Sequence, residues 1–420
     1  MNYYDTLEIR PPDERETALM AALPTQIAHA QAKSAAFAAI LKDIDASKVN
    51  TRAALARLPV TRKHELLERQ AAARQANPAQ SHVFGGFNTQ AFGHAMTRVF
   101  ASPGPIYEPE GKAVDYWRMA RAIYAAGFRR GDLIHNCFSY HFVPAGSMME
   151  TGAHAVGCTV FPGGTGQTEQ QVQAIGHLQP AGYIGTPSFL KIILERAAEL
   201  HQPLPASFNK AMLGGEAFPP SLRDWLAERG VAGYQCYATA DLGLIAYETT
   251  AREGLVLDEH VILEIVRPGT GDPVADGEVG EVVITSLNPD YPLIRFGTGD
   301  LSAVLQGNCP TGRTNTRIQG WMGRADQTTK MRGMFVHPGQ VDAVAKRFPE
   351  VARARLVVSG EMANDQMLLK VEVQNATDGL KDLLAAAVRD ITKLRADIEL
   401  CAVGSLPNDG KIIEDARSYK

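Results

Sequence analysis

The chain has 420 residues, of which 45% are hydrophobic, and it carries a formal net charge of −4 with a pI near 6.3. This length and hydrophobic content can support a large core and two or more domains. The acidic balance provides no basic surface and so argues against nucleic acid as a partner. The five cysteines have no paired spacing, which indicates free thiols in a reducing cytosol rather than disulfides.

Residues 1–16 are acidic and lack a basic region followed by an apolar core, so they do not have the pattern of a secretory signal. No apolar run approaches the ~20 residues that a membrane-spanning helix requires. We therefore expect a soluble, cytoplasmic protein with no membrane partner.

The first part of the chain predicts helices. Residues 16–41 are rich in alanine with apolar residues at helical spacing, which predicts one or two helices. Thr61 is placed to cap a helix over 62–76. A further amphipathic helix is expected over 114–127, and a buried strand over 132–136.

From residue 155 the pattern alternates between strands and helices. Strands are predicted over 158–161, 182–185 and 210–213, and helices over 169–178, 188–200 and 220–229. This alternation is typical of a largely parallel sheet whose ligands bind at the carboxyl ends of the strands.

The C-terminal part predicts a smaller domain. After a polar segment that changes character twice, as a hinge would, we expect elements over 338–348, 353–358, 366–373, 380–394 and 397–403. The predicted class is α/β: a large N-terminal domain, 1–326, has mostly parallel sheets and flanking helices. Residues 327–420 form a small α+β lid domain, a typical size for a compact unit.

The segment Ile294-Arg295-Phe296-Gly297-Thr298-Gly299-Asp300-Leu301 carries the first functional signal. Gly297 and Gly299 allow a sharp turn that would hold Asp300 out of the sheet as a fixed acceptor, which suits a ribose diol. The alternative is that Asp300 has only a structural role, as a carboxylate that caps a turn.

Several motifs together resemble those of a known family. Residues 294–301 and 323–333 are similar to the ribose-binding and hinge motifs of adenylate-forming acyl-CoA synthetases, and most similar to the phenylacetate–CoA ligase family. The similarity continues in residues 163–169, 185–188, 213–216 and 406–411. It covers nearly the whole chain in the family's order.

The resemblance implies roles for individual residues. Nucleotide or CoA contacts would come from Gly214, Gly215, Glu216, Tyr237, Ala238, Thr239, Asp300, Arg324, Arg332 and Gly333. Lys411 would be catalytic, with a solvated surface lysine as the alternative, and Asp326-Gln327 would form the hinge. An aromatic cluster would line the acid pocket (Phe138, Tyr140, His141 and Phe142). For Tyr140 and Phe142 we weigh plain core packing equally, and a lone His141 is more often structural.

Residues 237–241 (YATAD) depart from the family's Tyr-Gly-x-Thr/Ser-Glu motif. Tyr237 can still stack on adenine. Ala240 lacks the hydroxyl expected at the α-phosphate, for which Thr239 could substitute. Asp241 keeps a catalytic carboxylate for Mg²⁺, which prefers hard oxygen ligands.

Residues 97–109 (TRVFASPGPIYEP) stand where the resemblance implies a phosphate loop that ends in Lys-Pro. Such a loop needs free backbone N–H groups and a lysine. Pro103 and Pro105 offer no N–H, and Glu108 occupies the position of the lysine. A carboxylate ~4 Å from a phosphate charge would cost roughly 4 kcal/mol at an effective dielectric of about 20. Either this degenerate loop lies away from the nucleotide or ATP binds poorly.

Many relatives carry a zinc bound by cysteines and a histidine, which needs about four ligands. Only Cys309 remains of that set, so we expect no zinc.

We expect an AMP-forming acid–CoA ligase that uses ATP, Mg²⁺ and coenzyme A. A small carboxylic acid, aromatic or arylacetic by the family's preference, would form an acyl-adenylate while Lys411 stabilises the developing charge. CoA would then displace AMP. Two alternatives stay open: a protein that binds nucleotide or acyl-CoA without ATP turnover, and an enzyme that accepts a preformed adenylate or thioester. The sequence identifies neither the acid nor the oligomeric state, and it is compatible with a homodimer.

Overall fold

The structure is a computed structural model that describes residues 2–322, 324–325, 329–331, 334–336, 338–360, 365–374, 378–407 and 411–417. The chain divides into two compact units, Met1–Met322 and Gly323–Lys420. The boundary that we predicted, between 326 and 327, falls outside the described residues.

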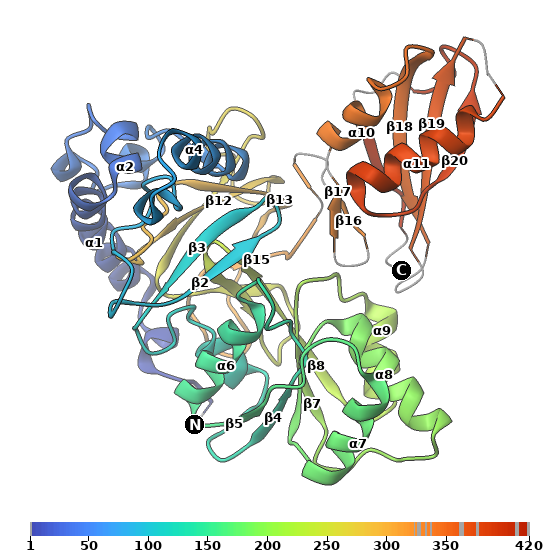
Figure 1. Ribbon diagram of the computed structural model, residues 1–420. Helices are drawn as coiled ribbons and strands as arrows, with labels where there is room; N and C mark the ends of the chain where they lie inside the picture. Colours follow the sequence, from blue (N-terminus) through green and yellow to red (C-terminus); the bar gives the residue numbers. More distant parts are fainter. Residues whose placement is uncertain are drawn as a thin grey trace. The chain divides into compact units, whose positions relative to one another are not determined.

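Helices dominate the start of the first unit, as predicted for residues 16–41 (Figure 1). The Ser34 hydroxyl accepts a hydrogen bond from the Phe37 N–H at 3.3 Å, so one helix ends and the next begins there. Leu23 and Ile27 are fully buried. The elements are η1 (Thr6–Ile9), α1 (Pro12–Lys33), α2 (Ala35–Ile40), η2 (Ala46–Lys48), α3 (Arg52–Leu55), α4 (Lys63–Ala76) and η3 (Gln80–His82).

The start of α4 differs from the prediction. Thr61 does not cap the helix but lies in β1 (Thr61–Arg62), which pairs in parallel with β13 (Phe296–Ser302). The Thr61 N–H donates to the Arg295 carbonyl at 3.0 Å. This long-range pairing brings the first turn of α4 beside the segment that contains Asp300.

β13 belongs to a four-stranded sheet in the order β1-β13-β12-β11, with β11 at Val261–Val266 and β12 at Gly280–Ser286. Apart from β1, its strands are antiparallel. β11 and β12 are buried along their whole length, so this sheet lies in the core of the unit.

Within residues 2–322, a nine-stranded sheet has the order β14-β15-β10-β9-β8-β7-β6-β4-β5. Its five strands from β8 to β5 are parallel, and the others are antiparallel. The bounds are β4 (Leu133–Asn136), β5 (Thr159–Phe161), β6 (Gly182–Gly185), β7 (Lys210–Leu213), β8 (Ala232–Thr239), β9 (Gly243–Glu248), β10 (Leu255–Leu257), β14 (Val304–Leu305) and β15 (Arg317–Ile318).

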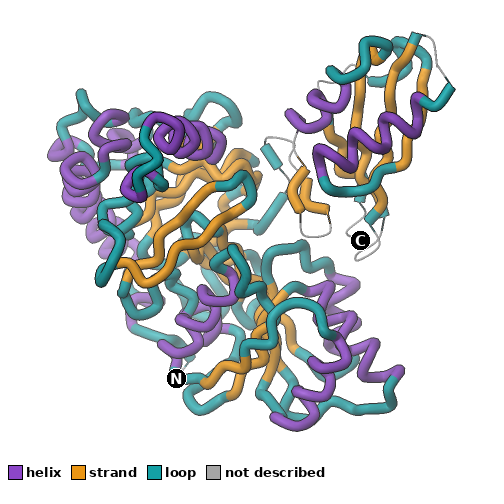
Figure 2. The backbone as a smooth tube through the Cα atoms, viewed as in Figure 1, coloured by secondary structure: helices purple, strands orange, loops and turns teal. Residues whose placement is uncertain are grey.

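Helices connect the parallel strands and flank them in Figure 2. They are α6 (Ala145–Val156), α7 (Thr168–Leu178), α8 (Pro187–Glu199) and α9 (Pro220–Ala227). This alternation confirms the predicted α/β class and the strand-to-helix order from residue 155.

The helix predicted over 114–127 is shorter, because α5 spans only Ala120–Ala125. Asp115, at a φ of 52°, accepts hydrogen bonds from the N–H groups of Met119 and Ala120 at 2.7 and 2.9 Å. The carboxylate satisfies the first free N–H groups of the helix and so holds the preceding residues in a turn.

Residues 97–109, the degenerate phosphate loop of the sequence analysis, form a β-hairpin. β2 (Met96–Ser102) pairs antiparallel with β3 (Ile106–Gly111) through a short turn at residues 103–105. Phe100 lies opposite Glu108 in this register.

The second unit is α+β, as predicted. Its four-stranded sheet has the order β20-β19-β18-β21 around a core that includes Leu356, Leu369 and Leu384. The described elements are β16 (Thr329–Met331), β17 (Met334–Val336), α10 (Pro338–Ala345), β18 (Val351–Ser359), β19 (Gln366–Val373), α11 (Leu380–Thr392), β20 (Asp397–Cys401) and β21 (Ile413–Asp415).

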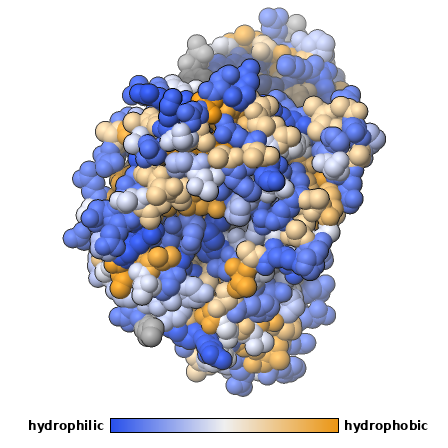
Figure 3. All heavy atoms as spheres, turned by 90° about the vertical axis from the view of Figure 1, so that its left-hand side faces the viewer, coloured by the Kyte–Doolittle hydropathy of each residue, from blue (hydrophilic) through white to orange (hydrophobic). Residues whose placement is uncertain are grey.

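Hydrophilic and hydrophobic residues are interspersed over the face shown in Figure 3. Among the described residues, no helix is both long and apolar enough to cross a membrane.

Candidate active site

The predicted adenine-binding motif lies directly after β7, at the carboxyl end of the parallel strands. The Gly214 N–H donates to the Gly185 carbonyl at the end of β6, at 3.2 Å. A Cβ on Gly214 would lie 2.9 Å from the Cys236 sulfur and 3.8 Å from Cζ of Phe138. Only glycine fits there, because the strand end is packed against these side chains. Gly215 follows at a φ of 76° and is exposed, which leaves backbone accessible for a flat ring.

Glu216 is held by the next helix. Its carboxylate accepts a hydrogen bond from the Ser188 hydroxyl at 2.6 Å, in the first turn of α8. Thr186 caps the same helix by accepting from the Phe189 N–H at 3.4 Å. The predicted motifs 185–188 and 213–216 are therefore brought together at one edge of the sheet.

Asp300, the carboxylate predicted to bind ribose, is in contact with Tyr237, the tyrosine predicted to stack on adenine. The Tyr237 hydroxyl lies 2.8 Å from Oδ2 of Asp300, and it also lies 3.2 Å from the Thr298 hydroxyl. The Trp321 indole N–H donates to Oδ1 of Asp300 at 3.1 Å. Both oxygens of this buried carboxylate are therefore oriented by donors from other elements.

Asp300 differs in one respect from the expectation, because it lies within β13 and not outside the sheet. A register shift opposite Glu281 and Val283 and a φ of 73° at Gly299 supply the local distortion. Just before β13, the buried Arg295 donates to Glu264 at 2.9 Å and to the carbonyl of Gly271 at 2.7 Å. These contacts anchor the segment from which Asp300 projects.

In the 237–241 segment, the β8–β9 register shifts between Tyr237 and Ala238, a bulge that redirects the strand end. The Thr239 hydroxyl accepts the Leu242 N–H at 3.1 Å, so its oxygen stabilises the turn. Its O–H can still donate to a phosphate. The structure thus keeps open the predicted substitution of Thr239 for the missing hydroxyl at Ala240.

Asp241 lies in a buried charged cluster that the sequence did not predict. Lys63, the first residue of α4, donates to Oδ2 of Asp241 at 3.0 Å. The other oxygen, Oδ1, is buried and has no hydrogen-bond partner. The Asp241 side chain is 2% exposed and that of Lys63 is 38% exposed, so the cluster opens towards solvent on the lysine side.

Glu108 is the second carboxyl group of this cluster. It is fully buried, and its Oε1 accepts the Ser102 hydroxyl at 2.6 Å across the hairpin. Burial, followed by the nearby Asp241 carboxylate, raises the pKa of Glu108 to about 8. A carboxyl group with this pKa is mostly protonated at neutral pH, so the repulsion expected from a charged Glu108 is reduced. The expected effect of this loop on ATP binding stays a prediction.

The four residues predicted to line the acid pocket differ in their burial. Phe138 is buried in the core next to Gly214, whereas His141 and Phe142 are exposed, Phe142 by 82%. Tyr140 is half-buried and its hydroxyl donates to Glu150 at 2.8 Å. Burial and then Glu150 raise the pKa of Tyr140 above its usual value.

The predicted residues of the second unit are described in part. Lys411 is exposed and lies two residues before β21, and Arg324 is half-buried. The hinge residues Asp326 and Gln327, and the CoA-channel residues Arg332 and Gly333, lie outside the described residues.

Three residues near the predicted motifs were missed: Lys63, Trp321 and His135. His135, at the end of β4, places Nε2 2.7 Å from Oε1 of Gln171. Gln171 in turn donates to the Gly163 carbonyl at 2.9 Å, in the predicted glycine-rich motif. His135 could have been predicted, because a histidine near the end of a predicted strand is a candidate site residue. Lys63 could not, because no local pattern in the sequence connects it to Asp241.

Among the residues that the structure describes, no group of three or more His, Cys, Asp or Glu side chains could hold a metal ion. Cys309 is buried, and its sulfur lies 3.1 Å from the Thr311 hydroxyl.

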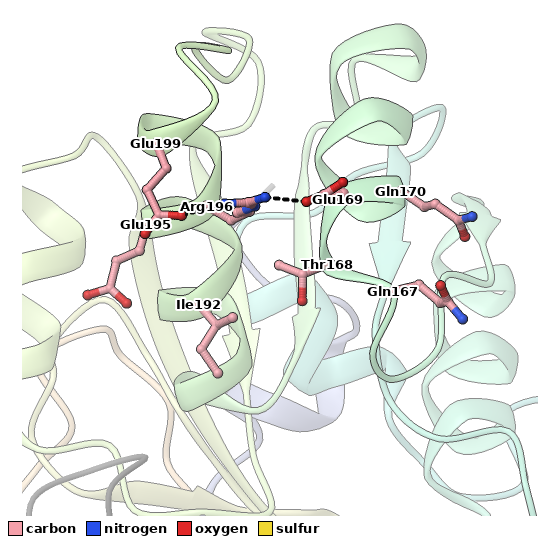
Figure 4. A pocket seen from close by; sticks show the side chains of 8 residues that line it. All are labelled: Gln167, Thr168, Glu169, Gln170, Ile192, Glu195, Arg196 and Glu199. Carbon is pink, nitrogen blue, oxygen red and sulfur yellow. Dashed lines mark hydrogen bonds and ion pairs between the residues drawn. The ribbon is translucent and has the colours of Figure 1, made fainter.

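A surface depression between α7 and α8 lies apart from these motifs (Figure 4). Arg196 pairs with Glu169 across it. Its lining includes no residue of the predicted site, so we do not place the active site there (Gln167, Thr168, Glu169, Gln170, Ile192, Glu195, Arg196 and Glu199).

Comparison with known proteins agrees with this geometry. Residues 112–288 match the family model of AMP-binding enzymes. The chain is 32% identical over 336 residues to the phenylacetate–coenzyme A ligase of Thermus thermophilus, covering 76% of this chain and 72% of the relative. It is 28% identical to that of Pseudomonas putida, covering 85% and 83%. A solved 2-hydroxyisobutyryl-CoA ligase in complex with 2-HIB-AMP and CoA has the same fold, with a TM-score of 0.82 at 24% identity and coverage of 100% of this chain and 93% of that one.

The fold and the nucleotide motifs therefore define an AMP-binding, adenylate-forming enzyme. Within this class, both of these curated relatives are phenylacetate–coenzyme A ligases. The chain belongs to the phenylacetate–CoA ligase family.

This membership confirms the predicted resemblance and the predicted class, an AMP-forming acid–CoA ligase. It argues against the alternative in which the fold binds nucleotide without ATP turnover. ATP or AMP and coenzyme A, both predicted, agree with the AMP-binding family and with the relatives' names.

Proposed function

We propose that the enzyme activates an aromatic or arylacetic acid. The acid's carboxylate attacks the α-phosphorus of ATP, which releases pyrophosphate and leaves an acyl-adenylate. The thiol of coenzyme A then attacks the acyl carbon, and AMP leaves. The names of the curated relatives support this acid class.

The observation that carries the nucleotide half of the proposal is the doubly oriented Asp300 carboxylate. Tyr237 and Trp321 hold its two oxygens, one each, at 2.8 and 3.1 Å. A carboxylate oriented in this way can accept both hydroxyls of a ribose. The exposed backbone of Gly215 provides a surface for adenine.

We assign Lys411 to the charge that develops as the carboxylate and the α-phosphate react. Arg324 would contact the nucleotide, Asp326-Gln327 would be the hinge, and Arg332-Gly333 would face CoA. These roles rest on the positions of the residues in the family's motifs.

The metal ion of this proposal is Mg²⁺. When bound, it would neutralise the charge of the ATP phosphates. The buried Oδ1 of Asp241 has no hydrogen-bond partner, so this carboxylate fits a hard cation that prefers oxygen ligands. A cytoplasmic location and a homodimer remain predictions.

Acid-dependent exchange between ATP and pyrophosphate tests the reaction. We expect the purified enzyme to catalyse exchange with arylacetates. Asp300→Asn should lower the rate about 10- to 100-fold, because hydrogen bonds to charged groups contribute roughly 1.5–3 kcal/mol. An enzyme that accepts only a preformed adenylate or thioester would show no exchange with any acid.

A second class of acid is favoured by one observation at the predicted pocket. Tyr140, Asn136 and Glu150 form a polar network, in which the Asn136 amide donates to the Tyr140 hydroxyl at 2.8 Å. A hydroxylated acid could join such a network more readily than an unsubstituted ring. Comparing phenylacetate, ring-hydroxylated phenylacetates and 2-hydroxyisobutyrate in the wild type and Tyr140→Phe separates the two classes. Preference for the hydroxylated acids should weaken in Tyr140→Phe if this network selects them.

A further inference from the structure

The β2–β3 hairpin contacts the segment that is predicted to line the acid pocket. The N–H of Ala101, in β2, donates to the Phe142 carbonyl at 2.7 Å. Phe142 has a φ of 64°, in the left-handed region that a residue other than glycine rarely adopts, and it is exposed. An exposed residue gains little from packing, so this backbone contact with the hairpin helps to hold the strained conformation.

Glu110, in β3, provides a second connection, because its buried carboxylate joins three elements. Its Oε2 accepts a hydrogen bond from the Trp117 indole N–H at 2.8 Å and one from the Ser147 hydroxyl, in the first turn of α6, at 3.0 Å. Arg98, on the neighbouring strand β2, donates to Oε1. Burying a carboxylate is costly unless donors satisfy it. These contacts therefore hold the start of α6 against the hairpin.

The start of α6 in turn supports the pocket segment. The Gly146 N–H donates to the Ser139 carbonyl at 2.9 Å, and the Asn136 amide donates to the Gly146 carbonyl at 2.9 Å. A Cβ on Gly146 would lie 2.8 Å from two ring atoms of Tyr140, so this ring packs directly on the backbone of the helix. Ser147 is the next residue, and a displacement of Ser147 would move the surface against which Tyr140 lies.

Trp117, the other donor to Oε2 of Glu110, is attached to the nine-stranded sheet. The Leu244 N–H, in β9, donates to the Trp117 carbonyl at 3.0 Å. A Cβ on Gly243 would lie 2.7 Å from the same carbonyl oxygen, so the two backbones are in close contact. Glu110 thus connects the start of α6 to the sheet at whose strand ends the nucleotide motifs lie.

We propose that Glu110 is a positioning residue for the acid substrate. By joining Trp117 to Ser147, it sets where residues 139–142 lie relative to the nucleotide motifs. The inference rests on the proposed function, which places the acid beside this segment. It gives the β2–β3 hairpin a role in placing the acid. A small displacement is enough to slow the reaction, because the carboxylate of the acid has to approach the α-phosphorus in a defined geometry.

Hydrogen–deuterium exchange of the full chain without ligands tests the connection. Glu110→Gln removes the charge of the carboxylate, and Ser147→Ala removes the hydroxyl that reaches it from α6. We expect both variants to raise the exchange rate of the amides in residues 139–146 severalfold and to leave those in residues 210–216 unchanged. Thr151→Ala is the matched control, because it removes a hydroxyl of the same helix that donates to a carbonyl of that helix at 3.1 Å.

ATP–pyrophosphate exchange then measures the consequence for the acid, with phenylacetate or with whichever acid of the panel above the wild type prefers. We expect Glu110→Gln and Ser147→Ala each to raise the KM for the acid about tenfold, a difference of about 1.4 kcal/mol. The Kd for AMP, from calorimetry, should stay within about twofold of the wild type. A general loss of structure would weaken the binding of both ligands, so the comparison separates positioning of the acid from packing alone.

Three results would overturn the proposal: unchanged amide exchange in both variants, an acid KM within about twofold of the wild type, or a rise in the acid KM that is matched by the Kd for AMP. If Glu110→Gln does not fold, Ser147→Ala decides by the same criteria. An absence of ATP–pyrophosphate exchange in the wild type with every acid would reject the proposed function instead. The amide exchange needs no substrate, so it would still show whether Glu110 positions this segment.

Discussion

At the scale of single residues, the site depends on donors that orient one carboxylate. Asp300 has little freedom, because Tyr237 and Trp321 hold its two oxygens and its own N–H donates to the Thr298 hydroxyl at 3.1 Å. An acceptor oriented before the ligand arrives loses less entropy on binding. The chemistry of this position therefore depends on its neighbours as much as on the aspartate.

We predict that Tyr237→Phe weakens AMP binding about tenfold, since one hydrogen bond to a charged group contributes roughly 1.5–3 kcal/mol. The ring, and hence any stacking on adenine, is retained. Isothermal titration calorimetry with AMP measures the change. Tyr234→Phe is the control, because it removes a hydroxyl from the same strand. Equal affinities in Tyr237→Phe and the wild type would mean that this hydroxyl does not orient Asp300.

His135 predicts a pH dependence of stability. Desolvation by burial lowers the pKa of His135 below its ordinary 6.5, so the folded protein holds this proton less tightly than the unfolded chain does. The stability is complete above pH 6.5 and should fall as the pH drops below that value. His135→Gln keeps a donor for Gln171 and should flatten this fall in urea unfolding measured between pH 7.5 and 5. A pH profile that is the same in the variant would show that other groups cause it.

Cys309 leads to a prediction about metal content. It is the one thiol at the positions where the resemblance implies zinc ligands, and a structural zinc needs about four. Elemental analysis of the purified protein should find no zinc. About one zinc per chain would contradict this.

At the scale of elements, the pairing of β1 with β13 determines which residues surround Asp241. Only two residues pair, Thr61 with Phe296 and Arg62 with Gly297, yet the pairing directs α4 so that Lys63 reaches Asp241, 178 positions away. The β2–β3 hairpin brings Glu108 to the same point.

The burial of Glu108 changes the expected effect of a charge reversal. A lysine at the family's position could favour ATP, but Glu108→Lys would place an ammonium group at a position with 0% exposure. We predict a loss of about 3–5 kcal/mol in the free energy of unfolding, as when a buried pair is broken. Urea unfolding measures it, with Val99→Lys, on the exposed side of the same hairpin, expected within about 0.5 kcal/mol of the wild type. A stable Glu108→Lys variant with tighter ATP binding would place Glu108 at the phosphates.

At the scale of the whole molecule, the chain consists of two units with separate cores. The nucleotide motifs up to Trp321 belong to the first unit, whereas Lys411 belongs to the second. A reaction with two half-reactions can use such a division, because a residue of one unit can serve one step and be dispensable for the other.

We predict that Lys411→Ala abolishes adenylate formation and leaves CoA transfer from a supplied acyl-adenylate largely intact. ATP–pyrophosphate exchange reports the first step, and thioester formation from the synthetic adenylate reports the second. Lys346→Ala, an exposed lysine of the same unit, is the control. Equal loss of both steps in Lys411→Ala would argue for a single arrangement of the site.

The sequence by itself determined the family, the α/β class and the order of the motifs. Glycines, turn residues and strand–helix alternation act over a few residues, so local patterns indicated Asp300, whereas Gly214 and Tyr237 became candidates through the resemblance of their motifs to the family. The contact between Tyr237 and Asp300 was not predictable, because it joins strands of two different sheets.

Only the tertiary structure decided that Glu108 is buried and that Lys63 contacts Asp241. A charged side chain looks the same in the sequence whether it faces solvent or a buried carboxylate, and its protonation depends on that environment. Likewise, no local pattern reports that a two-residue strand near position 61 will pair with one near position 296. The cluster of Lys63, Glu108 and Asp241 thus depends on contacts between segments far apart in the chain, which form only when the sheets assemble.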